Sequence, residues 1–567
     1  MLNLIIFIIS YFLISLSIIG YGSIFLRIFF KKIKITDFGY LGIFGLVLSI
    51  FISYSTNFFF PHNFTFNFVY LIIGLFGFIS LLSKLELKII KNELILFLLI
   101  FSLAFISLLI FKNHDDFPYY HFVYTYNLTQ FDLNVGIGQF NHGFRTPSSI
   151  FYINSLFYLP LIEYFSFNFA AVFVLAFSNI VLLKKIGFNN TKHLFFLKRL
   201  DNKNYTIIFF SLLSFIFINV FFYRIGEHGT DRSAQILVMI LILEIIMSLN
   251  KRYFDNYLNL KIFTLLVFII SLKAFYILYL LLLAPVFLNN FKQMNLRDLF
   301  LKTFFKNYIL LFFLIFLLML ITYFVNTGCM LYPVSITCFE NFSWSIPTNQ
   351  VEEMNKWYQQ WSKAGAGPEF RVENPEIYIK DFNWLKNWID KYFFNKVSDF
   401  LLGLIFLTLL TIIIFKSAIK KNIKLKKINY LLLLYFIILI LFFEWFYNHP
   451  ALRYGGYNLI AIIFFLPVSI YLSCKIYDTK KLKFFFPILI ILTISIFLGR
   501  NINRIYNEYT LYGYKPLKEP FYQVNENYFR EYKNLKNLIN SYKNCSQNNN
   551  CLTIDVKKKY GFYIFEN

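Results

Sequence analysis

Fourteen runs of mainly apolar residues dominate this 567-residue chain. A helix that crosses a bilayer needs about 20 such residues, with about 17 to 25 tolerated. Because 58% of residues are hydrophobic and only 15% are charged, a soluble globular class is excluded. The sequence predicts an all-α polytopic membrane protein with about 12–14 transmembrane helices. The runs lie at 3–26, 38–56, 67–83, 94–111, 166–183, 206–222, 234–249, 260–272, 274–290, 307–325, 399–415, 429–446, 457–474 and 484–499.

The positive charge of the chain is concentrated in alternate loops. The chain has 54 Lys and Arg against 30 Asp and Glu, a net charge of +24. Assigning alternate loops to opposite sides places 30 basic residues on one side and 6 in the short loops of the other. The positive-inside rule then makes the basic loops cytoplasmic and puts both termini outside. The excess charge orients the helices and requires no nucleic acid partner.

Domain organisation follows from the same runs. Residues 1–499 are predicted to form the transmembrane domain, with large outer loops at 112–165 and 326–398, and 500–567 an outer tail. No basic residue precedes the first run, so we expect a retained helix there, not a cleaved signal peptide. Residues 260–290 read either as a hairpin kinked at Lys273 or as one long segment. Three smaller expectations concern an amphipathic segment along the membrane surface at 378–395, a tail helix at 534–542, and tail strands at 552–556 and 560–565.

Four of the five cysteines form two close pairs in the predicted outer segments. Cys329 and Cys338 lie in the long outer loop, and Cys545 and Cys551 lie in the tail. Close pairs in an oxidising compartment predict two short-loop disulfides, although free thiols are the alternative. A zinc site is disfavoured because neither segment contains a histidine that would complete a ligand set.

The chemically unusual residues also lie in the outer loops. Asp115 and Asp116 follow the fourth run, where an aspartate could equally serve as a helix N-cap. Charged groups near the membrane are costly unless they face a cavity or a partner, so carboxylates, histidines and arginines from separate loops predict one polar site. The candidates are Asp115, Asp116, Tyr120, His121, His142, Arg145, Arg224, Glu227, His228, Lys273, His449 and Arg453.

Several motifs carry a family resemblance. An acidic pair in the first large outer loop of a many-helix chain with an outer tail resembles the GT-C superfamily of glycosyltransferases, which use polyprenyl-phosphate-linked sugars. More narrowly, the chain resembles an uncharacterised bacterial GT-C-like membrane family between about residues 110 and 455. The motifs are Asp116-x-x-x-Tyr120-His121, a glycine-rich stretch ending in Asn141-His142-Gly143, Glu227-His-Gly-Thr-Asp231-Arg232, and Gly328-Cys329-Met-Leu-Tyr332-Pro333-x-x-x-Thr337-Cys338-Phe339. Three extra runs precede the helix that leads into the acidic loop, which departs from better-known GT-C enzymes.

The resemblance implies an inverting transferase in the bacterial inner membrane, with its site and both termini facing the periplasm. It would move a sugar from a polyprenyl-phosphate donor to a cell-envelope acceptor, so its partners are membrane lipid and that donor. The base is implied to be Asp116, or Asp115 if the register slips by one. The implied phosphate ligands are Arg453, Arg224, Lys273 and Arg145, although each could instead face solvent or lipid headgroups.

The remaining candidate residues have less defined roles. His121 and His142 are expected to orient the base or contact the sugar, and a buried structural histidine is the alternative for each. Tyr120, Glu227, His228 and His449 complete the candidate binding residues. The resemblance leaves open whether a divalent cation bridges Asp116 and the donor phosphate, and it names no other cofactor.

Three competing functions remain open. A lipid-linked glycan polymerase or ligase is also polytopic, but such enzymes rely on Arg-rich outer loops, whereas the short outer loops here contain Asp-Asp and little Arg. A transporter would place ionisable groups at mid-membrane and would often show inverted repeats, and no internal repeat is visible. A catalytically inactive scaffold is the third.

Overall fold

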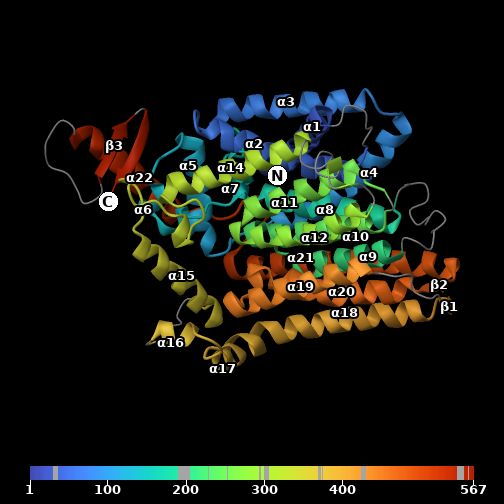
Figure 1. Ribbon diagram of the computed structural model, residues 1–567. Coiled ribbons are helices and arrows are strands. Elements are labelled where there is room, and N and C mark those ends of the chain that lie inside the picture. Colours follow the sequence, from blue (N-terminus) through green and yellow to red (C-terminus); the bar gives the residue numbers. More distant parts are fainter. Residues whose placement is uncertain are drawn as a thin grey trace.

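The computed structural model is a bundle of roughly parallel helices (Figure 1). It describes residues 1–29, 36–188, 205–227, 229–251, 253–292, 295, 297–298, 306–367, 372, 374–422, 429–545, 555–559 and 561–566. Among these residues, 12 helices are long and apolar enough to cross a membrane, and two shorter apolar helices lie beside them. Each of the fourteen predicted runs corresponds to one of these helices. The chain is therefore an all-α multi-pass membrane protein.

The first half of the chain supplies most of the buried helices. Its elements are α1 (Leu2–Phe29), α2 (Phe38–Asn57), α3 (Phe64–Leu82), α4 (Leu87–Phe105), η1 (Ile106–Leu108), η2 (Phe117–His121), α5 (Phe122–Gln130), α6 (Ile137–Phe140), η3 (His142–Phe144), α7 (Ser149–Ser155), η4 (Tyr164–Ser166), α8 (Phe169–Ile186), α9 (Tyr205–Phe221), η7 (Ile225–Glu227), α10 (Gly229–Leu249), α11 (Asn256–Leu272), η8 (Ala274–Leu283) and α12 (Ala284–Phe291). Of the η segments, η2 is a π-helix and the others are 3₁₀-helices.

The second half adds peripheral helices and two small sheets. Its elements are α14 (Asn307–Thr327), η9 (Ser335–Thr337), α15 (Thr348–Lys363), α16 (Pro375–Ile379), α17 (Leu385–Trp388), the π-helix η10 (Ile389–Val397), α18 (Ser398–Lys416), β1 (Ile419–Asn422), α19 (Asn429–Asn448), η11 (Leu452–Tyr454), α20 (Gly456–Ser473), β2 (Lys475–Tyr477), α21 (Thr479–Tyr512), α22 (Glu526–Cys545), β3 (Asp555–Lys559) and β4 (Phe562–Glu566). Each sheet is an antiparallel pair, β1 with β2 and β3 with β4.

The segments predicted to lie outside gather at one end of the bundle, which we call the capped end. It contains α5, α6, α15, α16, α22 and β3, at the left of Figure 1, whereas β1 and β2 lie at the opposite, basic end. Backbone hydrogen bonds join the C-terminal tail to the 112–165 loop. The Val135 N–H donates to Tyr563 O, and the Phe565 N–H donates to Val135 O, both at 2.9 Å. The tail and the 112–165 loop therefore form one layer over the helices.

Residues 256–291 form the predicted hairpin at Lys273. Lys261 in α11 lies 3.6 Å from Glu244 near the C-terminal end of α10. Asn289 in α12 donates to Ser248 O, at the same end of α10. Both arms of the hairpin therefore reach the basic end, and the extended backbone of Lys273 makes the turn at the capped end. This geometry excludes a single long segment.

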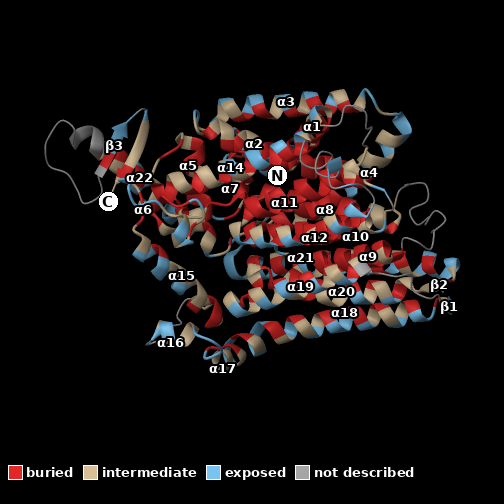
Figure 2. Ribbon diagram, in the orientation of Figure 1, coloured by how far each residue is buried: buried red, intermediate tan, exposed pale blue. Residues whose placement is uncertain are grey.

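Burial separates the central helices from the lipid-facing ones (Figure 2). The most apolar window of the span at Tyr164–Ile186 is wholly buried in protein, whereas only a third of the corresponding windows in the spans containing α18, α19 and α21 is buried. The central helices α8 and α10 therefore form the core of the bundle. The outer helices present side chains such as Leu402 and Phe406 to the surroundings.

Glycines set the close approach of α1 to its neighbours. A Cβ on Gly22 would lie 1.8 Å from Leu41 O, and one on Gly45 would lie 1.9 Å from Ile18 O. Helices in lipid gain stability mainly from such close packing, because lipid tails are as apolar as the side chains. The α1–α2 contact therefore depends on the missing side chains.

We expect Gly22→Ala to lower the thermal unfolding midpoint of the purified protein, because the added methyl group forces the backbones apart at a cost of about 1–3 kcal/mol. Gly499→Ala is the matched control, since nothing lies within 4 Å of a Cβ built there. Equal midpoints for the two variants would contradict the close-packing argument.

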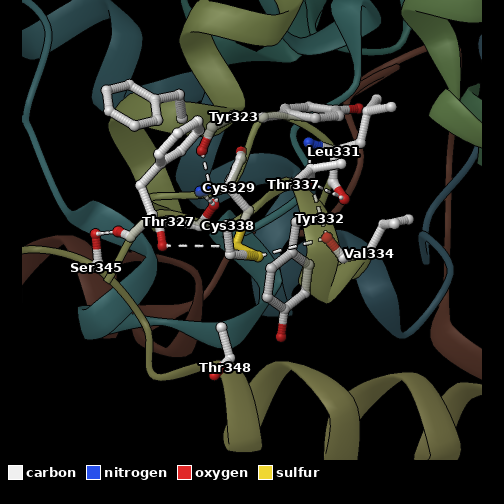
Figure 3. The surroundings of a disulfide bond; sticks show 12 residues. Tyr323, Thr327, Cys329, Leu331, Tyr332, Val334, Thr337, Cys338, Ser345 and Thr348 are labelled. Carbon is white, nitrogen blue, oxygen red and sulfur yellow. Dashed lines mark hydrogen bonds between the residues drawn. A yellow bond between two sulfur atoms is a disulfide. The ribbon is translucent and has the colours of Figure 1, made fainter. Parts of the chain in front are cut away.

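The loop at 326–398 contains one of the two predicted disulfides. Cys329 and Cys338 are bonded (Figure 3), which confirms that pair. The Thr337 hydroxyl donates to Val334 O at 2.7 Å and accepts from the Leu331 N–H at 3.1 Å, so the closed loop is also hydrogen-bonded internally. The pair Cys545–Cys551 lies outside the described residues at Cys551 and stays a prediction.

The segment 378–395, predicted to lie along the membrane surface, packs its tryptophans against another helix. From Leu385 it continues through η10 into α18 as one helical stretch to Lys416. Trp384 and Trp388 are buried, with ring centroids 5.5 and 5.4 Å from that of Phe446 in α19. These two tryptophans therefore join this segment to α19, and the position of the segment relative to the membrane stays a prediction. In the tail, the expected helix is present as part of α22, and the expected strand at 560–565 corresponds to β4. The expected strand at 552–556 lies outside the described residues except at Asp555 and Val556, which begin β3.

Candidate functional site

Asp116 lies at the start of η2, where Pro118 and the following aromatic residues begin a helical turn. Its side chain makes no N-cap hydrogen bond, so capping does not explain this aspartate. Instead its Oδ2 accepts a hydrogen bond from Arg453 Nη2 at 3.0 Å. His114 Nδ1 lies 3.6 Å from the same oxygen.

Asp231 shares the same guanidinium. Arg453 Nε donates to Asp231 Oδ2 at 3.1 Å, and Lys273 Nζ lies 3.1 Å from Asp231 Oδ1. Asp231 lies in the first turn of α10, and Lys273 makes the turn after α11. Four segments distant in sequence therefore meet in one group of charges, which we call the Arg453 cluster: Asp116, Asp231, Lys273 and Arg453.

The turn that carries Arg453 is held in place on several sides. The backbone N–H of Leu452 donates to the Tyr392 hydroxyl at 2.9 Å, and Gln235 Nε2 donates to Arg453 O at 2.9 Å. The guanidinium carbon lies 5.5 Å from the ring centroid of Trp361 and 5.6 Å from that of Tyr454. Arginine stacks well on aromatic rings, so these contacts position the guanidinium while leaving its edge for the two carboxylates.

Burial and the neighbouring positive charge shift the pKa of Asp116 in opposite directions. Burial alone would raise its pKa, but the Arg453 guanidinium holds the pKa below the usual value. The pKa of Arg453 is raised further, because Asp231 and Asp116 outweigh the effect of burial. Asp116 is therefore a carboxylate at neutral pH. Its side chain remains 29% exposed, whereas that of Asp231 is 11% exposed, so Asp116 is the more accessible of the two.

Two predicted site residues line the buried side of the cluster. Burial lowers the pKa of His121 to about 3 despite its interaction with Asp116, so its ring is neutral at physiological pH. Its Nε2 atom is buried without a hydrogen-bond partner. Burial together with Asp116 raises the pKa of Tyr120, which therefore keeps its proton. Both are neutral hydrogen-bonding groups beside a carboxylate.

Asp115 points away from this cluster. Its side chain is 88% exposed, and its partner is Lys112 at 3.5 Å. Of the acidic pair, only Asp116 faces Arg453.

Arg224 and Glu227 belong to a different group, which we call the Glu227 network. Arg224 Nε donates to Glu227 Oε1 at 2.8 Å, and Arg504 Nη1 lies 3.6 Å from the same oxygen and 3.8 Å from Glu508 Oε1. Arg504 and Glu508 lie on α21, in the stretch beyond residue 499 where the helix continues to Tyr512. Sequence reasoning placed Arg224 and Glu227 in the Asp116 site, and the structure pairs them with α21 instead.

The other predicted residues lie around the cluster. His142 lies beside Tyr119, with 3.5 Å between its Nδ1 and the hydroxyl, and burial lowers the pKa of its ring. Arg145 donates to Gly138 O and to the Tyr332 hydroxyl, at 3.1 and 3.0 Å, so its guanidinium holds the loop. Burial and Lys363 lower the pKa of His449 to about 4, and its ring packs against Tyr454. His228 lies outside the described residues.

The side chains around Asp116 do not form a set of ligands for a divalent cation. Among the residues that the structure describes, no group of three or more His, Cys, Asp or Glu side chains could hold a metal ion. The carboxylates of Asp116 and Asp231 face Arg453 and Lys273, which already supply positive charge there.

Sequence reasoning missed Asp231 as a site residue, together with Trp361 and Tyr454. Asp231 stands within the quoted motif Glu227-His-Gly-Thr-Asp231-Arg232, so the motif contained the signal. Helical geometry explains the omission, because consecutive residues on a helix project in directions about 100° apart. Without packing information, Asp231 could not be assigned to one network and Glu227 to another.

We expect Asp231→Asn to destabilise the protein more than Asp116→Asn. The first change leaves Arg453 and Lys273 without the carboxylate that joins them, and breaking a buried ion pair costs about 3–5 kcal/mol. The second removes a more exposed partner, with an expected cost of about 1 kcal/mol. Thermal unfolding midpoints of the two variants in the same detergent measure the difference. A larger drop for Asp116→Asn would contradict this order.

Comparison with known proteins gives one match. The sequence model of a family described as "Domain of unknown function (DUF8201)" matches residues 4–461, which is most of the chain and includes the Arg453 cluster. No curated protein and no solved structure matches the chain.

Proposed function

We propose that this chain, which belongs to the DUF8201 family, is an inverting membrane glycosyltransferase that moves a sugar from a polyprenyl-phosphate donor to a periplasmic acceptor. The observation that carries the proposal is the contact between Asp116 and Arg453 at the capped end of a membrane bundle. A partly exposed carboxylate there lies beside a guanidinium, at one end of helices long enough to cross a membrane. The GT-C resemblance supplies the reaction class.

In the proposed reaction, Asp116 is the general base. The acceptor hydroxyl oxygen bonds to the anomeric carbon as the bond from that carbon to the phosphate oxygen breaks. The electron pair of the broken bond leaves with the lipid phosphate, and the hydroxyl proton passes to Asp116. A lipid phosphate leaves without protonation, so one carboxylate suffices, whereas glycoside hydrolysis uses two. A positioned base contributes about 10²–10⁴-fold to such a reaction.

Arg453 would bind the donor phosphate and control the base. Arginine matches phosphate oxygens because its planar fork donates two parallel hydrogen bonds. In the free protein, Arg453 weakens Asp116 as a base by holding its pKa low. A donor phosphate that takes over the Arg453 Nη2 hydrogen bond would release Asp116 and raise its pKa. Donor binding would then strengthen the base at the moment when it is needed.

We expect Asp116→Asn to reduce transfer from a polyprenyl-phosphate-linked sugar by at least about 10²-fold, because the variant cannot accept the proton. Asp115→Asn is the matched control and should retain activity, since Asp115 is exposed and faces Lys112. The measurement is sugar transfer by equal amounts of purified, monodisperse protein in nanodiscs, tested over a panel of donors. Activity in Asp116→Asn at the unmodified rate would exclude this base, and loss in Asp115→Asn alone would move the role by one residue.

The pH profile should respond to Arg453. Because the pKa of Asp116 is lowered in the fold, its carboxylate stays ionised as pH falls until the medium is strongly acidic. Removing the guanidinium leaves the effect of burial, which raises the pKa. We therefore expect the acid limb of kcat/KM in Arg453→Gln to lie at higher pH than in the unmodified protein. A profile that is merely scaled down, with an unchanged acid limb, would show that Arg453 does not control the ionisation.

A further inference from the structure

Three partly exposed rings, which we call the aromatic trio, lie together at the capped end: Tyr119, His142 and Trp357. The Tyr119 hydroxyl lies 3.5 Å from His142 Nδ1, and the ring centroids of His142 and Trp357 are 6.2 Å apart. Tyr119 is 45% exposed and Trp357 is 41% exposed. The planes of His142 and Trp357 are 86° apart, so these two rings meet at an edge and do not stack face to face. Ring surface therefore remains accessible in the trio.

Helix α15 connects the aromatic trio to the Arg453 cluster. Trp357 precedes Trp361 by one turn, and residues four apart lie on the same face of a helix. The ring centroid of Trp361 lies 5.5 Å from the guanidinium carbon of Arg453. Trp357 therefore lies on the face of α15 that contacts the cluster, one turn away from the guanidinium.

The other two rings approach the cluster through η2. Asp116 precedes the first residue of η2, and Tyr119 follows it by three residues. The segment η3, which begins at His142, packs closely on η2, because a Cβ on Gly143 would lie 2.6 Å from Tyr120 Cβ. The aromatic trio thus lies next to the proposed base as well as next to the arginine.

The residues around Trp357 include exposed charges, which disfavours contact with acyl chains. Glu353 and Lys356, on the same helix, are both exposed. Such side chains are costly in contact with a bilayer interior, and α15 lies at the capped end of the bundle (Figure 1). Exposed apolar surface that is bordered by polar residues is typical of a ligand-binding surface.

A pyranose ring combines the two properties that this surface requires. Its faces present C–H groups, and its rim presents hydroxyl groups. C–H groups are attracted to the negative face of an aromatic ring. Burial and Arg145 lower the pKa of His142, so its imidazole is neutral at physiological pH, with one nitrogen as donor and the other as acceptor. Together with the Tyr119 hydroxyl, this ring can hydrogen-bond the rim of a saccharide.

We propose that the aromatic trio binds a pyranose ring of the acceptor, so that the acceptor is a saccharide whose hydroxyl is presented to Asp116. This inference rests on the proposed transferase function and adds to it the chemical class of the acceptor. It also assigns a binding role to Tyr119 and Trp357, which sequence reasoning did not include among the site residues.

The first test measures binding alone, without a donor. The full-length protein in nanodiscs is titrated with methyl pyranosides and disaccharides of neutral hexoses and N-acetylhexosamines, and binding is followed by saturation-transfer difference NMR. We expect saturable binding of at least one probe, and at least about fivefold weaker binding in Trp357→Ala, the effect expected for one lost ring contact. Trp357→Phe keeps a ring and should bind more tightly than Trp357→Ala. Tyr119→Ala should also weaken binding, whereas Tyr509→Ala, which removes a tyrosine that is 50% exposed on α21, is its matched control and should not.

The second test separates binding from chemistry. With donor present and the bound probe as acceptor, Trp357→Ala should raise the acceptor KM by about fivefold and leave kcat and the donor KM unchanged. A loss of kcat with an unchanged acceptor KM would show that Trp357 only supports the fold.

Other results would also overturn the inference. Saturable binding of none of the probes, or equal affinity of the unmodified protein, Trp357→Ala and Tyr119→Ala, would show that the trio does not bind a saccharide. Weaker phosphatidylglycerol binding in Trp357→Ala, with saccharide binding unchanged, would assign the ring to a lipid. Asp116→Asn should bind saccharides normally while transferring none. Intact saccharide binding by an unmodified protein that transfers no sugar would therefore exclude the transferase function and leave the binding site in place.

Discussion

Charge compensation inside an apolar bundle is the constraint on which this structure depends. Arg453 lies between Asp116 and Asp231, and Asp231 also holds Lys273. A charged group near the bilayer is costly unless it is paired, and removing one partner of a buried pair leaves the other uncompensated. The four residues come from the 112–165 loop, α10, the turn after α11 and η11. Satisfying these charges therefore also determines how the segments of the capped end meet.

The opposite end of α10 is held in the same manner. Glu244 is fully buried, contacts the Tyr40 hydroxyl, and lies 3.5 Å from Lys185 and 3.6 Å from Lys261. One central helix thus carries a paired carboxylate near each end, Asp231 at the capped end and Glu244 at the basic end. A transporter would use a buried carboxylate of this kind to carry a charge across the membrane. Here two lysines hold Glu244 near the helix end, which suits a structural tie between α2, α8, α10 and α11.

The sequence alone predicted those features of the fold that depend on short stretches of the chain. Each apolar run is recognisable by its own length, so all fourteen helices could be placed, and the Cys329–Cys338 bond followed from a close pair. The packing of the segment at 378–395 could not be predicted, because an amphipathic face looks the same whether it packs on lipid or on α19. Trp384 and Trp388 pack on Phe446, which is distant in the sequence.

Within the candidate site, the sequence indicated which residues take part more readily than which of them contact one another. Asp116, Lys273 and Arg453 were named from their positions in outer loops, and the structure places them together. The stretch Arg224–Arg232 was treated as one motif, but its charges divide between two networks. Glu227 pairs with Arg224 and Arg504, Asp231 pairs with Arg453 and Lys273, and Arg232 has no carboxylate partner among the described residues. Glu227 ends η7, whereas Asp231 and Arg232 occupy different faces of α10. The division also depends on α21, which lies more than two hundred residues later.

The pairing of Arg453 with Asp116 couples the binding of any anion at this guanidinium to a change in the carboxylate. An anion that approaches Arg453 must compete with Asp116 for Nη2. Its binding would therefore release a carboxylate whose pKa the guanidinium holds low. Asp231 accepts from Nε of the same guanidinium and also contacts Lys273, so Arg453 would stay in position while Nη2 exchanges partners. The proposed donor phosphate would in this way strengthen a neighbouring base as it binds and weaken it again as it leaves.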